Sequence, residues 1–178
     1  MDSINRQQPE NNRKDLNGGE AIKKMKEITD KNKTCYFCTH ATDGVPMAVR
    51  PMSLQQLDES GNFWFLSSND SHKNQEIQQD HAVHLLFQGS EHSDFLSVHG
   101  NASISHDKQK IKELWEPLAK VWFTEGKEDP RISVIKVTPI KGYYWDNKHG
   151  NAIAFVKMAA GALTGYTFDD SIEGEITL

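Results

Sequence analysis

Residues 63–77 read FWFLSSNDSHKNQEI, and this stretch joins a strand to a helix. Its apolar start predicts a strand over residues 63–67, because aromatic and aliphatic side chains suit a pleated, half-buried surface. The polar residues that follow predict a short helix over residues 70–79. Lys73 falls in the first turn of that helix, where its positive charge opposes the helix dipole. A lysine at this position calls for a stabilising partner.

A bound phosphate is one such partner. The N–H groups at a helix N-terminus form an anion site, and Ser67, Ser68 and Ser71 add hydroxyl donors beside the charge of Lys73. The alternative is that Asp70 or Ser71 caps the helix and Lys73 is solvated. The stretch lacks the glycines of a P-loop, so it predicts a phosphate site of another kind.

Arg50 is the second candidate phosphate ligand, in the segment MAVRPM at residues 47–52. Strand alternation puts it on the same face as Ala48 and Met52. An inward-facing arginine requires an anion or a carboxylate partner, whereas an arginine on the solvent face requires none. If two strands and a turn bring Arg50 beside Ser67 and Lys73, the three signals together predict one phosphate.

The rest of the chain predicts a mainly β fold. Expected strands lie at residues 34–40, 45–57, 63–67, 82–88, 95–105, 132–138 and 142–146. Four helices are expected. The first begins at Gly18-Gly19, the second spans residues 70–79, the third contains Ile111, Leu114, Trp115 and Leu118, and the fourth spans residues 151–163. We expect the first three strands to form a meander and the last two a hairpin around Pro139. Because βαβ alternation is missing, the pattern favours a closed or partly closed antiparallel barrel.

Length and composition predict one domain between two polar ends. We expect a disordered leader at residues 1–17, the domain at residues 18–166 and an acidic tail at residues 167–178. The net charge of −5 argues against a nucleic-acid or anionic-membrane binder. No apolar run approaches the roughly 18 residues of a membrane span, and the start of the chain lacks an apolar signal core. These features favour a cytoplasmic location.

Cys35 and Cys38 form a CxxC pair, which suggests redox or metal chemistry. In a strand, however, three residues rise about 10 Å, which exceeds the roughly 7 Å limit for a disulfide. We therefore expect two reduced cysteines on opposite faces. The eight histidines show no close ligand spacing, so no metal site is expected.

Aromatic residues outside the core pattern are candidate cofactor contacts. Trp122 and Phe123 fall in the loop at residues 122–131, and Tyr143, Tyr144 and Trp145 fall on a strand. Flat rings can stack on a planar cofactor or anchor a dimer. Core packing is the alternative.

Five segments carry a resemblance that extends over residues 18–165. In chain order they are MAVRPM, FWFLSSNDSHKNQEI, LSVHGNASI, VWFTEGKEDPR and IKVTPIKGYYWD. In this order they resemble the pyridoxamine 5′-phosphate oxidase-like FMN-binding split barrels, in particular the general stress protein 26 branch. The resemblance implies a six-stranded antiparallel Greek-key split barrel with flanking helices. It also implies a homodimer with two FMN sites at the subunit interface, although FAD remains an alternative cofactor.

The resemblance also assigns cofactor-binding residues. Arg50, Pro51 and Met52 would contact the flavin and its phosphate, and Ser67, Ser68 and Lys73 would hold the phosphate tail. The candidates for aromatic side chains that line the flavin from the partner subunit are Trp122, Phe123 and Trp145.

The end of the chain departs from the vitamin B6 oxidases, which carry a basic W…R-L segment there. This chain ends in KMAAGALTGY and an acidic stretch, with no arginine after Arg131, which disfavours pyridoxamine phosphate oxidation. The leading interpretation is a stress-related, flavin-dependent oxidoreductase of unassigned substrate and catalytic residues. The alternatives are a flavin-binding or redox-sensing module without turnover, and a cofactor-free dimeric scaffold.

Overall fold

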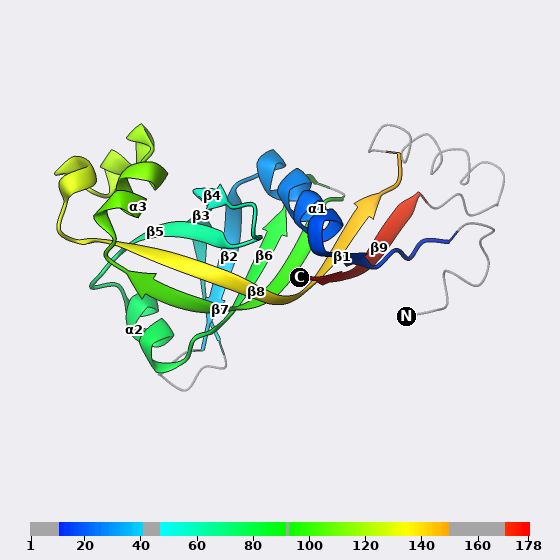
Figure 1. The fold of residues 1–178 in the computed structure, drawn as a ribbon, viewed down its shortest axis with the longest axis horizontal. Helices are drawn as coiled ribbons and strands as arrows, with labels where there is room; N and C mark the ends of the chain where they lie inside the picture. The colour runs from blue at the N-terminus through cyan, green and yellow to red at the C-terminus, as the bar shows by residue number, and fades with distance from the viewer. Residues whose placement is uncertain (1–10, 41–46, 92, 150–169) are drawn as a thin grey trace.

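The computed structural model describes residues 11–40, 47–91, 93–149 and 170–178, which form a curved, mainly antiparallel sheet with three α-helices (Figure 1). Six strands make up the barrel: β2 (Thr34–Thr39), β3 (Ala48–Ser53), β5 (Phe63–Ser68), β6 (Ala82–Gln88), β7 (Phe95–Ser105) and β8 (Ile132–Asn147). The α-helices are α1 (Gly18–Lys31), α2 (His72–Gln79) and α3 (Lys108–Leu114). Shorter elements are β1 (Leu16–Asn17), β4 (Gln56–Leu57), β9 (Ser171–Thr177) and the 3₁₀ turns η2 (Pro117–Val121) and η3 (Gly126–Glu128).

The six barrel strands pair in the order β3-β2-β6-β7-β8-β5, and each pair is antiparallel. β3 and β5 lie at the two ends of this order, and no ladder joins them among the described residues. The predicted mainly β split barrel is therefore confirmed. The predicted meander is wrong, because the segment at residues 45–57 breaks after Ser53. Its second part, β4, pairs with β5, and β5 crosses to β8 instead of pairing with β3.

The core fills the inside of the curved sheet. Along β5, Phe63, Phe65 and Ser67 are buried while the residues between them are half-buried, as strand alternation requires. Phe65 packs edge-to-face on Phe37 of β2, with ring centroids 5.3 Å apart. α1 covers one end of the barrel through Ala21, Met25 and Ile28, which lie on one face at helical spacing. A smaller cluster under α3 contains Ile111, Leu114, Ala119, Phe123, Ile132 and Val134.

β8 is one continuous strand, so the predicted hairpin around Pro139 is wrong. Gly100 pairs with Pro139 and His99 with Lys141, which leaves Ile140 as an extra residue in a bulge. A bulge lets a strand tolerate proline, which has no N–H to donate. The first part of β8 pairs with β5 and the last part with β9, so this strand joins the barrel to the terminal segments.

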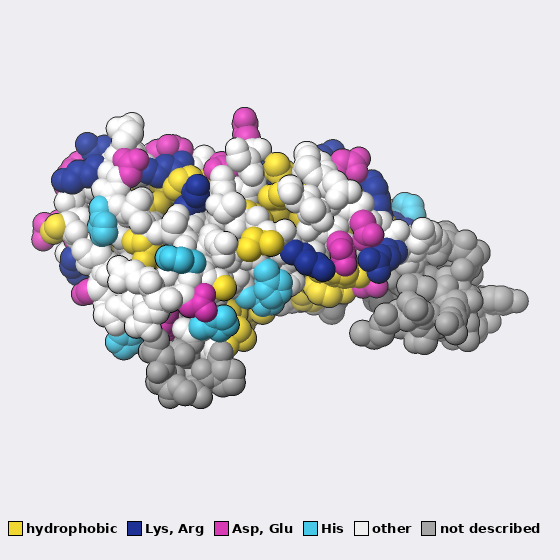
Figure 2. Space-filling model, turned by 60° about the horizontal axis from the view of Figure 1, so that its bottom comes forward, with side chains coloured by type: hydrophobic (Ala, Val, Ile, Leu, Met, Phe, Trp, Pro, Cys, Tyr) yellow, Lys and Arg dark blue, Asp and Glu magenta, His cyan; other side chains and the backbone are white. Residues whose placement is uncertain are grey.

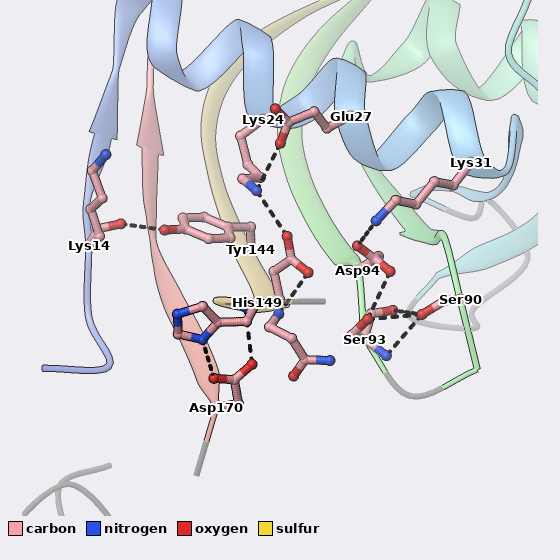
Figure 3. Close-up of polar contacts among 12 residues, drawn as sticks. Lys14, Lys24, Glu27, Lys31, Ser90, Ser93, Asp94, Tyr144, His149 and Asp170 are labelled. Atoms are coloured by element: carbon pink, nitrogen blue, oxygen red, sulfur yellow. Dashed lines mark hydrogen bonds and ion pairs between the residues drawn. The ribbon is translucent and has the colours of Figure 1, made fainter. Parts of the chain in front are cut away.

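The described residues at both ends of the chain pair with each other and with β8. β1 runs parallel to β9, and the Lys14 N–H donates to the Glu173 carbonyl at 2.9 Å. The Tyr144 hydroxyl donates to the Lys14 carbonyl at 2.8 Å (Figure 3). In β9, Ile172 and Ile176 alternate with acidic residues that face outward. Residues 1–10 and the expected helix at residues 151–163 lie outside the described residues.

The helix expected through Leu118 ends at Leu114 instead. Proline restricts the residue before it to extended conformations, so Pro117 stops the α-helix and starts the separate turn η2. Leu118 is consequently exposed rather than buried. None of the described helices is long and apolar enough to cross a membrane.

Two ion pairs with largely buried carboxylates fix α1 to the sheet (Figure 3). Lys24 donates to Asp146 of β8 at 2.9 Å, and Lys31 pairs with Asp94 at the start of β7. Burial opposes the ionisation of Asp94, yet hydrogen bonds from Lys31 and Ser93 lower its pKa to about 2. These contacts hold the helix at the end of the barrel away from α2 (Figure 1).

Candidate functional site

The strand-to-helix junction is fixed by a chain of hydrogen bonds centred on Asn74 of α2. The Ser67 hydroxyl donates to the Asn74 Oδ1 at 2.9 Å, and the Asn74 Nδ2 donates to the Ser133 hydroxyl of β8 at 2.8 Å. Ser133 in turn donates to the Ser67 carbonyl at 3.0 Å. All three side chains are buried. Ser67 therefore uses its hydroxyl proton to hold α2 against β5 and β8.

Ser68 lies on the other face of β5 and points at the start of the helix. Its hydroxyl donates to Asp70 at 2.5 Å, and this hydrogen bond lowers the pKa of Asp70. Ser68 is half-buried, so its hydroxyl oxygen remains a potential acceptor. The described hydrogen bonds of the two serines are thus made within the junction itself.

Arg50 faces inward at the same end of the barrel. It pairs with Phe37 across the β2–β3 ladder, and opposite residues of a ladder share a face, so its side chain lies on the core side. Its Nη1 donates to the Glu76 Oε2 of α2 at 2.7 Å. The Thr39 hydroxyl of β2 donates to the same oxygen at 2.5 Å. The partner of Arg50 in the structure is therefore a carboxylate.

Glu76 is a site residue that the sequence analysis did not single out. It lies three positions after Lys73, so the two share a helix face, and this spacing is the signal that could have found it. Burial opposes the ionisation of Glu76, but hydrogen bonds from Arg50 and Thr39 lower its pKa below the ordinary value. Glu76 is therefore an anion in the neutral pH range.

Lys73 carries a charge that has no partner side chain among the described residues. It is half-buried and makes no hydrogen bond or ion pair within the part of the chain that the structure describes. Burial lowers its pKa, and the positive charge of Arg50 lowers it further, while Glu76 and Asp70 act in the opposite direction. Arg50 and Lys73 are thus close enough to repel each other, and the buried Glu76 carboxylate attracts both. An anion at this point would stabilise both cations.

The remaining predicted cofactor contacts lie on several different elements. Pro51 lies on the outer face of β3, and Met52 packs inward against the core. Phe123 is buried in the cluster under α3, whereas the neighbouring Trp122 is exposed. Within one chain, these two loop aromatics therefore occupy different environments.

Trp145 is the most distant candidate. It lies on the outer face of β8, twelve residues beyond Ser133. At the strand rise this corresponds to a separation of up to roughly 40 Å along β8. Within one chain, Trp145 therefore lies far along β8 from Ser133, which contacts the junction of β5 and α2. It packs against Tyr143, with ring centroids 4.7 Å apart.

The two cysteines of β2 are free, as predicted, and both are fully buried. Burial raises the pKa of Cys35 to about 12, so its thiol is protonated and unreactive at neutral pH. The described residues contain no group of three or more histidine, cysteine or acidic side chains placed to hold a metal ion.

Comparison with known proteins agrees with the fold. The profile of the family described as pyridoxamine 5′-phosphate oxidase like matches residues 20–169. The chain belongs to this family. Protein bli-3 of Neurospora crassa is 26% identical over 153 residues, which cover 81% of this chain and 73% of that protein.

Solved structures share the split-barrel fold of this chain. A general stress protein 26 from Jannaschia sp. matches with a TM-score of 0.73 and 20% identity, covering 88% of this chain and 97% of that one. A general stress FMN/FAD binding protein from Xanthomonas citri matches with a TM-score of 0.59 and 24% identity, covering 67% of this chain and 84% of that one. The flavin is named for the Xanthomonas citri protein, and at this identity the likeness shows the shared fold.

Proposed function

We propose that this protein binds FMN and that Arg50 and Lys73 hold the flavin phosphate. The observation that carries the proposal is Lys73, half-buried and without an ion pair among the described residues, beside the inward-facing Arg50. A phosphate bears up to two negative charges and several acceptor oxygens, so it would pair with both cations through charge-assisted hydrogen bonds. The N-terminal N–H groups of α2 would add donors to the same anion.

The split in the barrel supports a site for the rest of the cofactor. β3 and β5 carry Arg50 and Ser68, and the two strands are not joined by a ladder among the described residues. An unpaired strand edge presents backbone N–H and C=O groups that a ligand can use. The polar atoms of an isoalloxazine ring would suit such an edge. Family membership and the flavin named for the Xanthomonas citri protein favour this cofactor, with FAD as the alternative.

A second copy of the chain would complete the site. The outer sheet face exposes large apolar side chains, namely Tyr36, Val49 and Trp145, with relative exposures of 58%, 51% and 42%. Figure 2 shows hydrophobic and histidine side chains lying near one another on one face of the molecule. Ladder register aligns Pro51, Tyr36, Leu86, Ser97 and Tyr143 in one row across the outer face. A homodimer that covers this face would bring aromatic side chains of a partner subunit to the flavin.

Bound FMN supplies one- and two-electron redox chemistry, so the proposed activity is that of a flavin-dependent oxidoreductase. This chain would bind and orient the cofactor, and the apolar dimer interface would exclude water from it. The general stress protein 26 likeness favours a role in stress rather than vitamin B6 oxidation. A cytoplasmic location fits this role.

A flavin titration tests the proposal. Wild-type protein should bind FMN, and Arg50→Ala and Lys73→Ala should each weaken binding about tenfold to a hundredfold, because each removes a hydrogen bond to a charged group. Lys26→Ala, at an exposed position of α1, is the matched control and should leave the affinity unchanged. Quenching of flavin fluorescence measures each affinity. Wild-type protein that leaves FMN unbound at millimolar concentration would contradict the proposal.

A further inference from the structure

Glu76 occupies a central position among the charged side chains at the start of α2. Its side chain is only 11% exposed, and a single oxygen, Oε2, accepts from both Arg50 and Thr39. A buried carboxylate is costly unless it is paired, so this arrangement has to be satisfied in the folded protein.

Thr39 fixes the carboxylate independently of any ligand. It is 2% exposed in the middle of the sheet, where β2 pairs with β3 on one side and β6 on the other. Its hydroxyl lies at the end of a short, stiff side chain, because threonine is restricted about χ1. The Glu76 Oε2 is therefore held against the barrel wall, and α2 and β2 are tied together at this point.

Arg50 engages Glu76 through one nitrogen only. A guanidinium has five N–H donors in a planar fork, and the structure gives Arg50 a single described hydrogen bond, from Nη1. The N–H groups of Nε and Nη2 thus remain available as donors, while the hydrogen bond from Nη1 to Glu76 fixes the orientation of the guanidinium. This is the arrangement of an oriented ligand-binding group with a supporting partner.

We infer that Glu76 is a positioning residue for phosphate binding, acting through Arg50. This inference rests on the proposed function. It adds that the hydrogen bonds from Thr39 and Arg50 to Glu76 orient the guanidinium toward the phosphate. The competing possibility is that Glu76 is only a counter-ion that the phosphate must displace. The two differ in sign: removing a positioning residue weakens phosphate binding, whereas removing a displaced counter-ion strengthens it.

The experiment compares FMN with riboflavin, which has the same ring system without the phosphate. Glu76→Ala should weaken FMN binding about tenfold, the lower end of the loss seen when supporting partners of binding groups are removed. Riboflavin affinity should stay unchanged. Glu76→Gln keeps an acceptor for Arg50 and Thr39, so it should recover part of the FMN affinity. Thr39→Val should weaken FMN binding in the same phosphate-specific way.

Each outcome has a distinct meaning. Tighter FMN binding by Glu76→Ala, or an equal loss for FMN and riboflavin, would overturn the positioning role. Failure of the wild-type protein to bind FMN would overturn the proposed function instead. Far-ultraviolet circular dichroism and the midpoint of thermal unfolding show whether each variant folds. Should Glu76→Ala not fold, the Glu76→Gln and Thr39→Val pair decides: unchanged FMN affinity in both would overturn the inference.

Discussion

At the scale of single residues, the site is defined by charges that do not balance within one chain. Lys73 is half-buried without an ion pair in the described chain, while Arg50 already has Glu76 as its partner. Burial and the neighbouring Arg50 both disfavour the charged lysine, which is the meaning of its lowered pKa. Such a residue costs stability in the free protein and is explained by what it binds.

Replacing Lys73 with methionine should therefore have opposite effects on stability and binding. Lys73→Met keeps the length of the side chain and removes the charge, so the free energy of unfolding of the ligand-free protein should rise by about 1 kcal/mol. The same variant should lose the thermal stabilisation that FMN gives the wild-type protein. Urea denaturation and thermal shift with and without FMN measure the two effects. A variant less stable than wild type would show that the lysine is balanced in the free protein.

At the scale of elements, two prolines and one glycine decide where α3 ends and how β8 pairs with β7. Pro117 ends α3, and Pro139 sits in a bulge opposite Gly100. Gly100 has no room for a side chain, since an added Cβ would lie 2.6 Å from the Thr138 carbonyl oxygen. Backbone atoms cannot yield as a flexible side chain can. The bulge that keeps β8 continuous therefore requires glycine at this position.

Gly100→Ala should destabilise the fold by about 2 kcal/mol, because the added methyl group overpacks against the backbone of β8. Gly19→Ala is the matched control: it lies in the first turn of α1, where an added Cβ meets no atom within 4 Å. That variant should be neutral or slightly stabilising. Chemical denaturation of both proteins checks the difference. Equal midpoints would mean that the β7–β8 contact relaxes without cost.

At the scale of the whole molecule, the sheet is an open barrel whose outer face exposes apolar side chains. Tyr36 on this face is 58% exposed, and the stacked rings of His84 and His99 lie in the next row, 3.8 Å apart. Contiguous apolar surface on a soluble protein marks an interaction site. The proposed partner subunit on this face would explain how aromatic residues distant from Arg50 within one chain could reach the proposed cofactor.

Sedimentation should therefore show the mass of two chains for wild-type protein. Tyr36→Asp places a charge in the middle of the proposed interface and should shift the protein toward single chains. Ser60→Asp introduces the same charge in an exposed turn and should leave the dimer intact. Analytical ultracentrifugation across a concentration series distinguishes them. A wild-type protein that stays monomeric at high concentration would contradict the proposed dimer.

Much of this fold follows from local patterns in the sequence. The strands β6 and β7 fall at the predicted residues, because their alternation of apolar and polar side chains is regular. β9 was missed although Ile172 and Ile176 alternate with glutamates, since an acidic composition suggests a solvated tail. The continuity of β8 was missed because a bulge depends on the partner strand, which local sequence does not show.

The site was predictable only where a residue is unusual within its local sequence. Arg50 and Lys73 are identifiable because each is unusual within its own element. Glu76 and Asn74 are not, because a polar residue on a short helix is ordinary until its tertiary contacts with Thr39 or Ser133 are known. The resemblance to a flavin-binding family connected residues that local patterns leave separate.

A crystal structure of the protein with FMN tests the central claim most directly. It should show the FMN phosphate within hydrogen-bonding distance of both Arg50 and Lys73 of one protomer, at the N-terminus of α2. A phosphate bound elsewhere, with Lys73 still unpaired and Arg50 still held by Glu76 alone, would contradict it.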